Sequence, residues 1–392
     1  MKIALVHDEL VRKGGSEQVL LSFHNAFPDA PIYTLSYNAE TTYPQFKDCK
    51  IVTSFFGKVI KTEKNLKRFF FPFGVWSMSR LSLKGYDVIL QSTTHCSKYV
   101  KTDPGALIIT YCHTPFRLVW RPNSYLEIEN ANVIKSFMYR TVINILKKID
   151  NAYAKKTDWF IANASEVVER IKLAYHPKNK ITVINPSVKC ENFYISKEVG
   201  DYFLVVSRLE PYKRVDLVVE AFNQMKDKKL IVVGKGSMEK DLKEMAGENT
   251  TFLSNLDAVQ LSEVYSKCKA FIFPQLEDYG IAPLEANASG RPVIAFGKGG
   301  IRDTMIPFTA NSANATAVFF YEQTVVALKK AISEFETISF DPNFLRKHAE
   351  SFDDNVFVEK IKSFVLEKYT QTKVNKARAL CIGLLYCFSQ FL

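Results

Sequence analysis

Two carboxylates and a glycine turn stand in one short stretch, and their residue types and spacing suit the binding of a sugar phosphate. Glu277 and Glu285 have seven residues between them in the segment FPQLEDYGIAPLEANASGRPVIAFGKGG, where Gly280 separates a loop from a helix-like run. The apolar runs 270–273 and 292–295 are typical of buried strands, and open α/β sheets bind ligands outside the carboxyl ends of such strands. A helix N-terminus there offers N–H groups to a phosphate. The carboxylates beside it are therefore expected to accept hydrogen bonds from sugar hydroxyls.

The same segment resembles the retaining glycosyltransferases of family 4, which have the two-domain GT-B fold. The resemblance is carried by E-x7-E followed by GRPVIA and a GG turn. It implies that Glu277 contacts the donor sugar and the reacting region, and that Glu285 accepts hydrogen bonds from the nucleotide ribose. It also implies that the N–H groups around Gly280, Ile281 and Ala282 point at the phosphates. By spacing alone, two solvated glutamates on a surface helix are the more common explanation of the pattern.

A basic pair follows a predicted strand in the segment SRLEPYKRVDLVVEAF. Arg208 offers a guanidinium that grips a diphosphate with two hydrogen bonds, and Lys213 adds a point charge. R-x4-K resembles the diphosphate-binding pair of the family, although a solvated basic pair is the plain alternative. The positions that resemble the base pocket are Gly234, Phe252 and Leu253. Asp303 stands where the family's GGxxE usually has glutamate. Because no DxD-like pair stands in a plausible metal position, we expect metal-independent transfer without a cofactor.

A second glycine pair, Gly14-Gly15, follows the apolar run 2–6 and precedes a helix that Ser16 can cap. Glycine lets the backbone approach a phosphate closely, but a simple tight turn explains the pair as well. The resemblance implies that this loop covers the donor diphosphate. GxGxxG is absent, which disfavours a dehydrogenase with a dinucleotide cofactor.

His113 lies in CHTPFR-x2-W, directly after the predicted strand 106–111. This motif resembles the family subgroup that includes mannosyltransferases, whose histidine contacts the donor sugar. The resemblance implies that His113 forms hydrogen bonds to the sugar and polarises the site rather than acting as a nucleophile. A structural histidine at a strand end is the alternative. His7 and Asp8 either border an acceptor pocket or pack at a strand end.

Apolar strands alternate with amphipathic helices along the chain, and the alternation restarts after a Pro-containing break. This pattern predicts an α/β protein with two doubly wound, Rossmann-like domains facing across a cleft. The pattern places a linker at 186–197 and an apolar tail at 371–392. The family resemblance implies that 1–185 is an acceptor domain, that 198–350 is a nucleotide-sugar domain, and that a helix at 351–370 returns to the first domain.

The net charge of the chain indicates its class of partner, and its cysteines indicate the compartment. The 392 residues carry a net charge of +11, which favours an anionic partner, but no RNA-binding signature or Cys/His finger spacing supports nucleic acid. Seven cysteines without any CxxC indicate reduced thiols in the cytosol and no zinc site. The N-terminus MKIALVHDEL is a charged strand and not a signal peptide.

Aromatic and basic residues interleave between Phe55 and Trp76, which favours contact with an anionic membrane surface. The residues of this stretch are Phe55, Phe56, Lys58, Lys61, Lys64, Lys67, Arg68, Phe69, Phe70, Phe71, Phe73 and Trp76. A core helix with a solvated basic face is an equally good explanation. The run Ala379–Leu392 is too short to span a bilayer and is either a second apolar anchor or a packed helix. We expect peripheral contact with the cytoplasmic face of a membrane.

The sequence thus predicts a retaining glycosyltransferase that moves a hexosyl group, with GDP-mannose as the expected donor. The expected acceptor is a glycan or a polyprenyl-linked sugar in surface-polysaccharide or lipopolysaccharide biosynthesis. The alternatives are a nucleotide-sugar epimerase on the same fold and an inactive nucleotide-sugar-binding protein. The presence of Arg208, Lys213, Glu277 and Glu285 together argues against inactivity.

Overall fold

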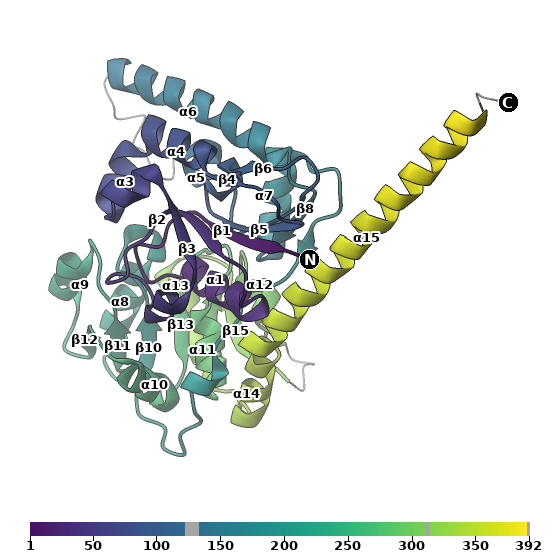
Figure 1. The fold of residues 1–392 in the computed structure, drawn as a ribbon. Helices are drawn as coiled ribbons and strands as arrows, with labels where there is room; N and C mark the ends of the chain where they lie inside the picture. Colours follow the sequence, from purple (N-terminus) through teal and green to yellow (C-terminus); the bar gives the residue numbers. More distant parts are fainter. Residues whose placement is uncertain (122–132, 310–313, 390–392) are drawn as a thin grey trace. The chain divides into compact units, whose positions relative to one another are not determined.

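The structure, a computed structural model, describes residues 1–121, 133–309 and 314–389, with the backbone alone for residues 133 and 378–389. The chain divides into two compact units, one of Met1–Ile184 with Phe357–Leu392 and the other of Asn185–Val356. Each unit is built on its own parallel sheet with helices on both faces (Figure 1). This arrangement confirms the predicted α/β class with two doubly wound domains. The residues expected as a linker, 186–197, belong to the second unit.

The first unit holds a parallel sheet in the order β3-β2-β1-β5-β7-β8-β9 within the described residues. Its strands are β1 (Ile3–His7), β2 (Ile32–Ser36), β3 (Ile51–Ser54), β5 (Val88–Thr93), β7 (Leu107–Cys112), β8 (Trp159–Ala162) and β9 (Thr182–Val183). The chain winds outward from β1 to β3, then returns to β5 and winds the other way. The order therefore reverses between β1 and β5, and the carboxyl ends of these two strands flank the switch point where such sheets bind ligands.

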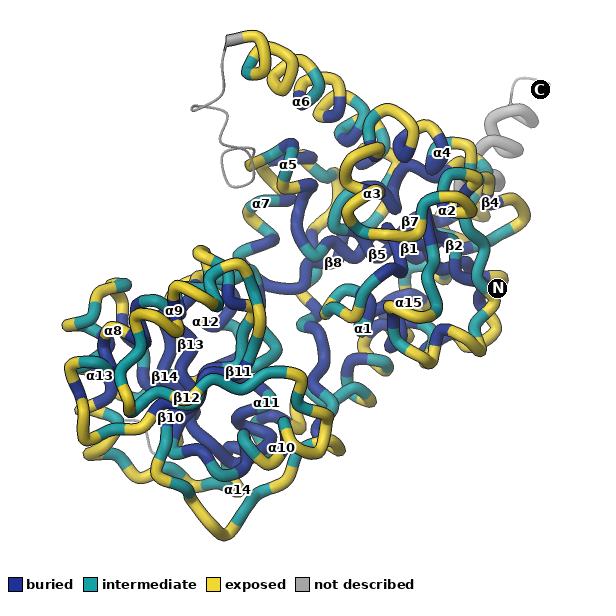
Figure 2. The backbone as a smooth tube through the Cα atoms, turned by 90° about the vertical axis from the view of Figure 1, so that its left-hand side faces the viewer, coloured by how far each residue is buried: buried dark blue, intermediate teal, exposed yellow. Residues whose placement is uncertain are grey.

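Alternate residues of β1 enter two different hydrophobic clusters. Ile3 and Leu5 pack with α1 (Gly15–Ala26) on one face of the sheet. Ala4 and Val6 pack in a second cluster on the other face. The strand is apolar from Ile3 to Val6 because side chains of successive residues point to opposite faces and both faces are covered. The strands accordingly form the buried interior of the unit (Figure 2).

The helices of the first unit follow the alternation that the sequence predicted. They are α1, α2 (Phe55–Val59), α3 (Glu63–Phe69), α4 (Val75–Arg80), α5 (Arg117–Trp120), α6 (Val133–Ala154) and α7 (Ser165–Tyr175), with a π-helical turn at Phe70–Gly74. A small parallel sheet of β4 (Ser82–Leu83) and β6 (Lys101–Thr102) was not predicted. Two-residue strands carry too short a pattern to be read from sequence.

The last helix, α15 (Asp354–Ser389), returns to the first unit and completes its core. Phe357, Ile361, Phe364 and Val365 follow helical spacing and are buried among the residues of the first cluster. Phe357 stacks on Phe23 with ring centroids 6.1 Å apart. The predicted return of this helix is confirmed. Of the tail Ala379–Leu392, residues 390–392 and all the side chains lie outside the described residues, so its role as an anchor stays a prediction.

The second unit holds a parallel sheet in the order β12-β11-β10-β13-β14-β15 within the described residues. Its strands are β10 (Phe203–Val206), β11 (Leu230–Val233), β12 (Thr250–Leu253), β13 (Phe271–Phe273), β14 (Val293–Phe296) and β15 (Ala317–Phe320). Its helices are α8 (Val215–Asn223), α9 (Glu239–Met245), α10 (Ala258–Lys267), α11 (Ala282–Ala288), α12 (Ile301–Thr304), α13 (Val325–Phe335) and α14 (Pro342–Glu350). The order reverses between β10 and β13, which places a second switch point at their carboxyl ends. Strand β15 was not predicted.

Candidate active site

Three loops of the second unit gather at the carboxyl edge of its sheet because β10, β13 and β14 are neighbours there. The loop after β10 carries Arg208 and Lys213, the loop after β13 carries Glu277, and the loop after β14 carries the glycine turn. The sequence separates these groups by up to about ninety residues, and the parallel sheet brings them to one edge.

The Lys213 ammonium and the Glu277 carboxylate form an ion pair. Both side chains are largely buried, with 12% and 21% of their surface exposed. The ring of Tyr212 lies against both cations, with its centroid 5.9 Å from Cζ of Arg208 and 5.4 Å from Nζ of Lys213. Arg208 also donates a hydrogen bond to the Tyr212 hydroxyl and is otherwise exposed. The two predicted cations and the first predicted carboxylate are therefore neighbours.

The glycine turn packs directly against the backbone of the Glu277 loop. Glu277 and Gly299 form a parallel bridge, and the amide of Gly300 donates to the Glu277 carbonyl at 2.9 Å. A Cβ at Gly300 would lie 2.2 Å from the carbonyl oxygen of Asp278. A Cβ at Gly299 would lie 2.4 Å from the Glu277 carbonyl oxygen, and Gly299 has a φ of +81°. The GG turn is thus required for docking two loops together, whatever ligand it also contacts.

Glu285, in the first turn of α11, accepts a hydrogen bond from the hydroxyl of Tyr265 at 2.8 Å. Tyr265 is fully buried on α10. Burial raises the pKa of the Glu285 carboxyl, and the Tyr265 hydroxyl counteracts part of that rise. Tyr265 was not predicted, because it lies within the amphipathic pattern of a helix and gives no signal of its own.

The remaining predicted donor residues lie on the same edge of this sheet. Gly280 has a φ of +92°, and a Cβ there would lie 2.6 Å from the Phe273 ring. Gly234 directly follows β11, where a Cβ would lie 1.8 Å from the Ser207 carbonyl oxygen. The other predicted positions are Ile281 and Ala282 at the start of α11, Phe252 and Leu253 at the end of β12, and Asp303 in α12, all of them partly buried. Their roles stay predictions.

In the first unit, a chain of three polar side chains links the carboxyl ends of β1, β5 and β7. The Ser92 hydroxyl lies 3.1 Å from Nδ1 of His7 and 2.9 Å from Nε2 of His113. Burial, together with the nearby His7 and Arg117, lowers the pKa of His113 to about 3. The imidazole of His113 is therefore neutral at neutral pH, which suits the predicted exchange of hydrogen bonds with a sugar.

Asp8 is a buried anchor for the loop after β5. Its oxygens accept the backbone N–H groups of Cys96 at 2.7 Å and Ser97 at 2.6 Å, and the Thr94 hydroxyl at 2.7 Å. Burial opposes the charge, yet the His95 imidazole and the N–H donors hold the pKa of Asp8 well below its usual value. For Asp8, the structure supports packing at a strand end rather than a place in an acceptor pocket.

Asp8, His95 and Cys96 also have ligand atoms within 4.8 Å of one another. Their chemistry does not suit a metal ion, however. Both oxygens of Asp8 already accept hydrogen bonds, and burial raises the pKa of the Cys96 thiol to about 12. Because the thiolate is the form that binds metals, we assign this group to the structure of the loop.

Gly14 and Gly15 lie at the start of α1, in the first unit. A Cβ at Gly14 would lie 2.6 Å from Oε2 of Glu17, which is fully buried. The Arg12 guanidinium approaches the carboxylates of Glu9, Glu17 and Glu63, each at 3.2 Å. Gly14, Gly15 and His113 thus belong to one unit, whereas the other predicted site residues belong to the second.

The Glycosyl transferases group 1 family matches residues 192–364. An alpha-1,3/1,6-mannosyltransferase ALG2 from Kluyveromyces lactis is 23% identical over 387 residues, which covers 81% of this chain and 73% of that protein. The O-antigen chain mannosyltransferase RfbU from Salmonella typhimurium is 29% identical over 168 residues, 41% of this chain and 47% of that protein. The solved structure of Anabaena Alr3699/HepE in complex with UDP has a TM-score of 0.66 at 16% identity, covering 94% of this chain and 100% of that one. Residues 192–364 therefore match a group 1 glycosyltransferase domain, and the fold of the chain is GT-B.

Proposed function

We propose that this glycosyltransferase is a retaining mannosyltransferase of family 4, which moves mannose from GDP-mannose to a glycan or polyprenyl-linked acceptor in surface-polysaccharide assembly. The observation that carries the proposal is the cluster of Arg208, Lys213 and Glu277 at the switch point of the group 1 domain. The names of the ALG2 and RfbU relatives support mannose as the sugar. HepE binds UDP, so guanine is the part of the donor that most needs testing.

The cations are arranged to stabilise a departing diphosphate. Arg208 is exposed, and Lys213 is paired with Glu277. A bound diphosphate compensates Lys213 in place of Glu277, which leaves the Glu277 carboxylate able to accept hydrogen bonds from the donor sugar. Preorganised charges of this kind stabilise the negative charge that develops on the leaving group. We propose that they do so without a metal ion or other cofactor.

Retention of the anomeric configuration requires the new bond at C1 to form on the face of the sugar from which the diphosphate departs. In the proposed step, the bond between the sugar C1 and the diphosphate oxygen breaks, and the acceptor oxygen bonds to C1. The acceptor proton passes to the departing phosphate oxygen. His113 is neutral and so serves as a hydrogen-bonding partner of the sugar, and Glu285 holds the ribose.

A donor panel tests the proposal directly. Purified protein is incubated with GDP- and UDP-sugars, with and without a mannosylated acceptor, and products are followed by mass spectrometry. Acceptor-dependent transfer from GDP-mannose, insensitive to EDTA, is the expected result. Conversion of the donor sugar without an acceptor would indicate the epimerase alternative, and inhibition by EDTA that a divalent cation reverses would overturn the metal-free proposal.

Arg208→Ala and Lys213→Ala are each expected to lower turnover about 100-fold or more, by analogy with the loss of one preorganised charge stabiliser. The matched control is Lys240→Ala, because that lysine is 84% exposed on α9 and pairs only loosely with Glu244 at 3.7 Å. The assignment of the diphosphate site fails if both variants retain the turnover of this control.

Contact with the cytoplasmic face of a membrane is the second part of the proposal. In the stretch 55–76, Leu66, Phe70 and Val75 enter the core. Phe55, Phe73 and Trp76 are 72%, 58% and 53% exposed, and Lys58, Lys61, Lys64 and Lys67 are exposed beside them. The stretch is therefore both a core element and an exposed aromatic and basic surface, which supports the prediction of membrane contact.

Helix α6 adds apolar surface that the sequence analysis did not identify. Ile134, Phe137 and Met138 are 73%, 71% and 60% exposed on neighbouring positions of this helix. Throughout the described residues, no helix combines the length and apolarity needed to cross a bilayer. We therefore propose a peripheral contact, expected to appear as salt-sensitive co-sedimentation with anionic vesicles that weakens when the four lysines are replaced by glutamate.

A further inference from the structure

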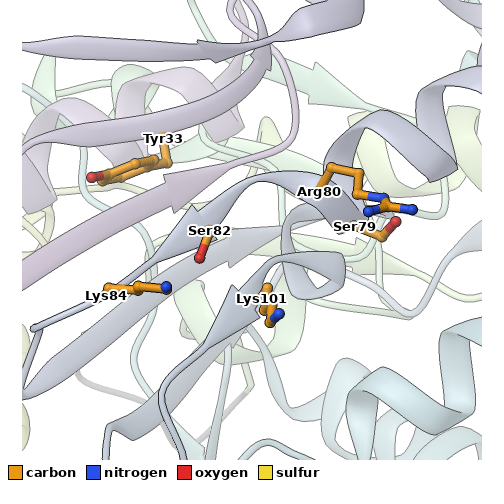
Figure 3. A pocket seen from close by; sticks show the side chains of 6 residues that line it. All are labelled: Tyr33, Ser79, Arg80, Ser82, Lys84 and Lys101. Atoms are coloured by element: carbon orange, nitrogen blue, oxygen red, sulfur yellow. The ribbon is translucent and has the colours of Figure 1, made fainter.

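A cavity of about 690 Å³ opens in the first unit between α4, β4 and β6 (Figure 3). Its lining residues are Tyr33, Ser79, Arg80, Ser82, Lys84 and Lys101. The register of the small sheet pairs Ser82 with Lys101, so the two strands hold their side chains next to each other. Three of the six lining residues are cations and none is an acid, which makes this a strongly basic cavity.

The cations of this cavity form no ion pair within the described residues, and Arg80 packs against the Trp76 ring. Among the described residues, no carboxylate lies within ion-pair distance of Arg80, Lys84 or Lys101, and all three are exposed. The Ser82 hydroxyl adds a donor, whereas the Ser79 hydroxyl donates to the Trp76 carbonyl oxygen at 2.7 Å. The Tyr33 hydroxyl lies 2.9 Å from that of Tyr86, and burial raises the pKa of Tyr33 to about 12, so the phenol stays neutral. Cations combined with neutral hydroxyl donors are the groups that bind phosphate oxygens.

The cavity is separate from the proposed reaction site. Tyr86, which contacts Tyr33 of the lining, comes before β5, whereas Ser92 lies at the carboxyl end of that strand beside His113. Six residues of extended strand span roughly 20 Å. The cations Lys84 and Lys101 belong to the segments that precede β5 and β7, so they lie toward the amino-terminal ends of those strands, whereas Tyr33 lies level with Val6 and Gln91 near the carboxyl ends.

The exposed aromatic residue Trp76 lies against one of the residues that line the cavity. Cζ of Arg80, which lines it, lies 5.7 Å from the ring centroid of Trp76 on the same helix. Trp76 and Phe73 are both more than half exposed. A soluble anion needs the cations alone, but a lipid phosphate comes with an apolar surface that these two side chains suit.

We propose that this basic cavity binds the phosphate group of an anionic membrane lipid, with Trp76 and Phe73 entering the interface beside it. Three clustered cations match the two charges of a terminal phosphomonoester better than the single charge of a phosphodiester. The inference deepens the proposed membrane contact and rests on it, but it is independent of glycosyl transfer. It assigns headgroup selectivity to Arg80, Lys84 and Lys101, whereas Lys58, Lys61 and Lys64 respond only to surface charge.

Vesicle binding distinguishes a site that selects a lipid headgroup from nonspecific attraction to a negatively charged surface. Phosphatidylcholine vesicles are doped with phosphatidate or with phosphatidylglycerol to the same measured surface charge. The full chain is expected to bind the phosphatidate vesicles at least about threefold more tightly, because charge-assisted hydrogen bonds to a terminal phosphate add to the shared surface attraction. Equal binding to the two vesicle types would overturn the proposal.

Two variants with the same loss of charge assign the selectivity. Arg80→Gln/Lys84→Gln/Lys101→Gln is expected to remove the preference for phosphatidate. Lys58→Gln/Lys61→Gln/Lys64→Gln is expected to weaken binding to both vesicle types and to keep the preference. If the first variant keeps the preference, the cavity is not the site. Lys101→Gln alone, which is expected to reduce the preference, serves if the triple variant does not fold.

A second experiment, with an anion in solution, distinguishes binding of a lipid phosphate from binding of a free anion. Inorganic pyrophosphate is titrated into protein saturated with GDP, so that the donor site is already occupied. Tight binding of pyrophosphate that the triple cavity variant abolishes, without any vesicle preference, would show a soluble-anion site and overturn the lipid assignment. Transfer to a soluble acceptor is expected to be unchanged in the cavity variant. Loss of vesicle selectivity alone therefore contradicts this inference, and loss of transfer alone contradicts the proposed function.

Discussion

Individual residues of the site differ in how well the sequence predicts them. Arg208, Lys213 and Glu277 were predicted from recognisable spacing, and the structure brings them together at one edge of the sheet. Tyr265 was not predicted, because it stands twenty residues before Glu285 on another helix and reaches it only through the packing of α10 against α11. Such partners depend on tertiary packing, which a local pattern does not encode.

The buried Glu285 carboxyl is expected to lower the stability of the folded protein and to raise its affinity for the donor. Its pKa is raised in the folded protein, so the folded state holds its proton more tightly and stability falls as pH rises above the ordinary glutamate range. Glu285→Gln should therefore be more stable than the wild type at neutral pH. It should also bind the donor about tenfold or more weakly, the cost of one hydrogen bond to a charged group. Urea unfolding and donor titration measure the two effects, and unaltered donor affinity would contradict the ribose assignment.

His113 is expected to make the protein sensitive to acid. Its pKa is lowered to about 3, so between pH 6.5 and about 3 the unfolded chain binds a proton that the folded chain does not. Stability should fall with falling pH across this window, by up to about 1.4 kcal/mol per pH unit from this group. His113→Gln should show a correspondingly shallower dependence in urea unfolding at a series of pH values. Parallel curves for the two proteins would show that His113 titrates normally.

At the scale of elements, the strands were easier to predict than the contacts between loops. Apolar runs such as 270–273 and 292–295 gave β13 and β14 to within a residue. Strand β15 (Ala317–Phe320) was missed because four apolar residues alone do not distinguish a strand from a buried helix. The sequence places the glycine turn at the ligand-binding edge of the sheet, whereas its close approach to the Glu277 loop is visible only in the structure.

Gly300→Ala tests the docking of these two loops. The backbone of Gly300 has an ordinary helical φ of −67°, so the expected cost is steric and comes from the Asp278 carbonyl oxygen 2.2 Å from the new Cβ. We expect a loss of about 1–3 kcal/mol in the free energy of unfolding and a raised KM for the donor. Gly105→Ala is the control, because only the Lys376 ammonium comes within 4 Å of its Cβ. Equal stability of the two variants in thermal unfolding would argue against the tight docking.

For the whole molecule, the two-domain α/β class and the return of the last helix followed from the sequence. The alternation of elements predicts each doubly wound half, and the resemblance to the two-domain fold implies the return of the last helix. The position at which the chain changes units, between Ile184 and Asn185, is a property of the contacts. In the sequence, the Pro-containing break begins at Asn185, directly after this position.

Phe357→Ala is expected to destabilise the first unit in particular. Phe357 is 2% exposed and packs on Phe23 and Tyr111, so its truncation should cost about 3–5 kcal/mol. Hydrogen exchange followed by mass spectrometry should show faster exchange in the strands of the first unit and little change in those of the second. Leu366→Ala, at a 45% exposed position of the same helix, is the control. Uniform acceleration in both units would mean that they unfold as one.

The second unit is an insertion between the two segments of the first, and this has a consequence for the order in which the chain folds on the ribosome. All of Asn185–Val356 is synthesised before Phe357, Ile361 and Val365, which complete the core around Phe23. The second unit can therefore fold first. The amino-terminal segment of the first unit meanwhile keeps part of its apolar surface exposed. Nascent chains stalled just after Val356 has left the exit tunnel should resist protease within the inserted segment and be cleaved within the amino-terminal one. Until the last helix emerges, the amino-terminal segment exposes apolar surface of the kind that chaperones bind.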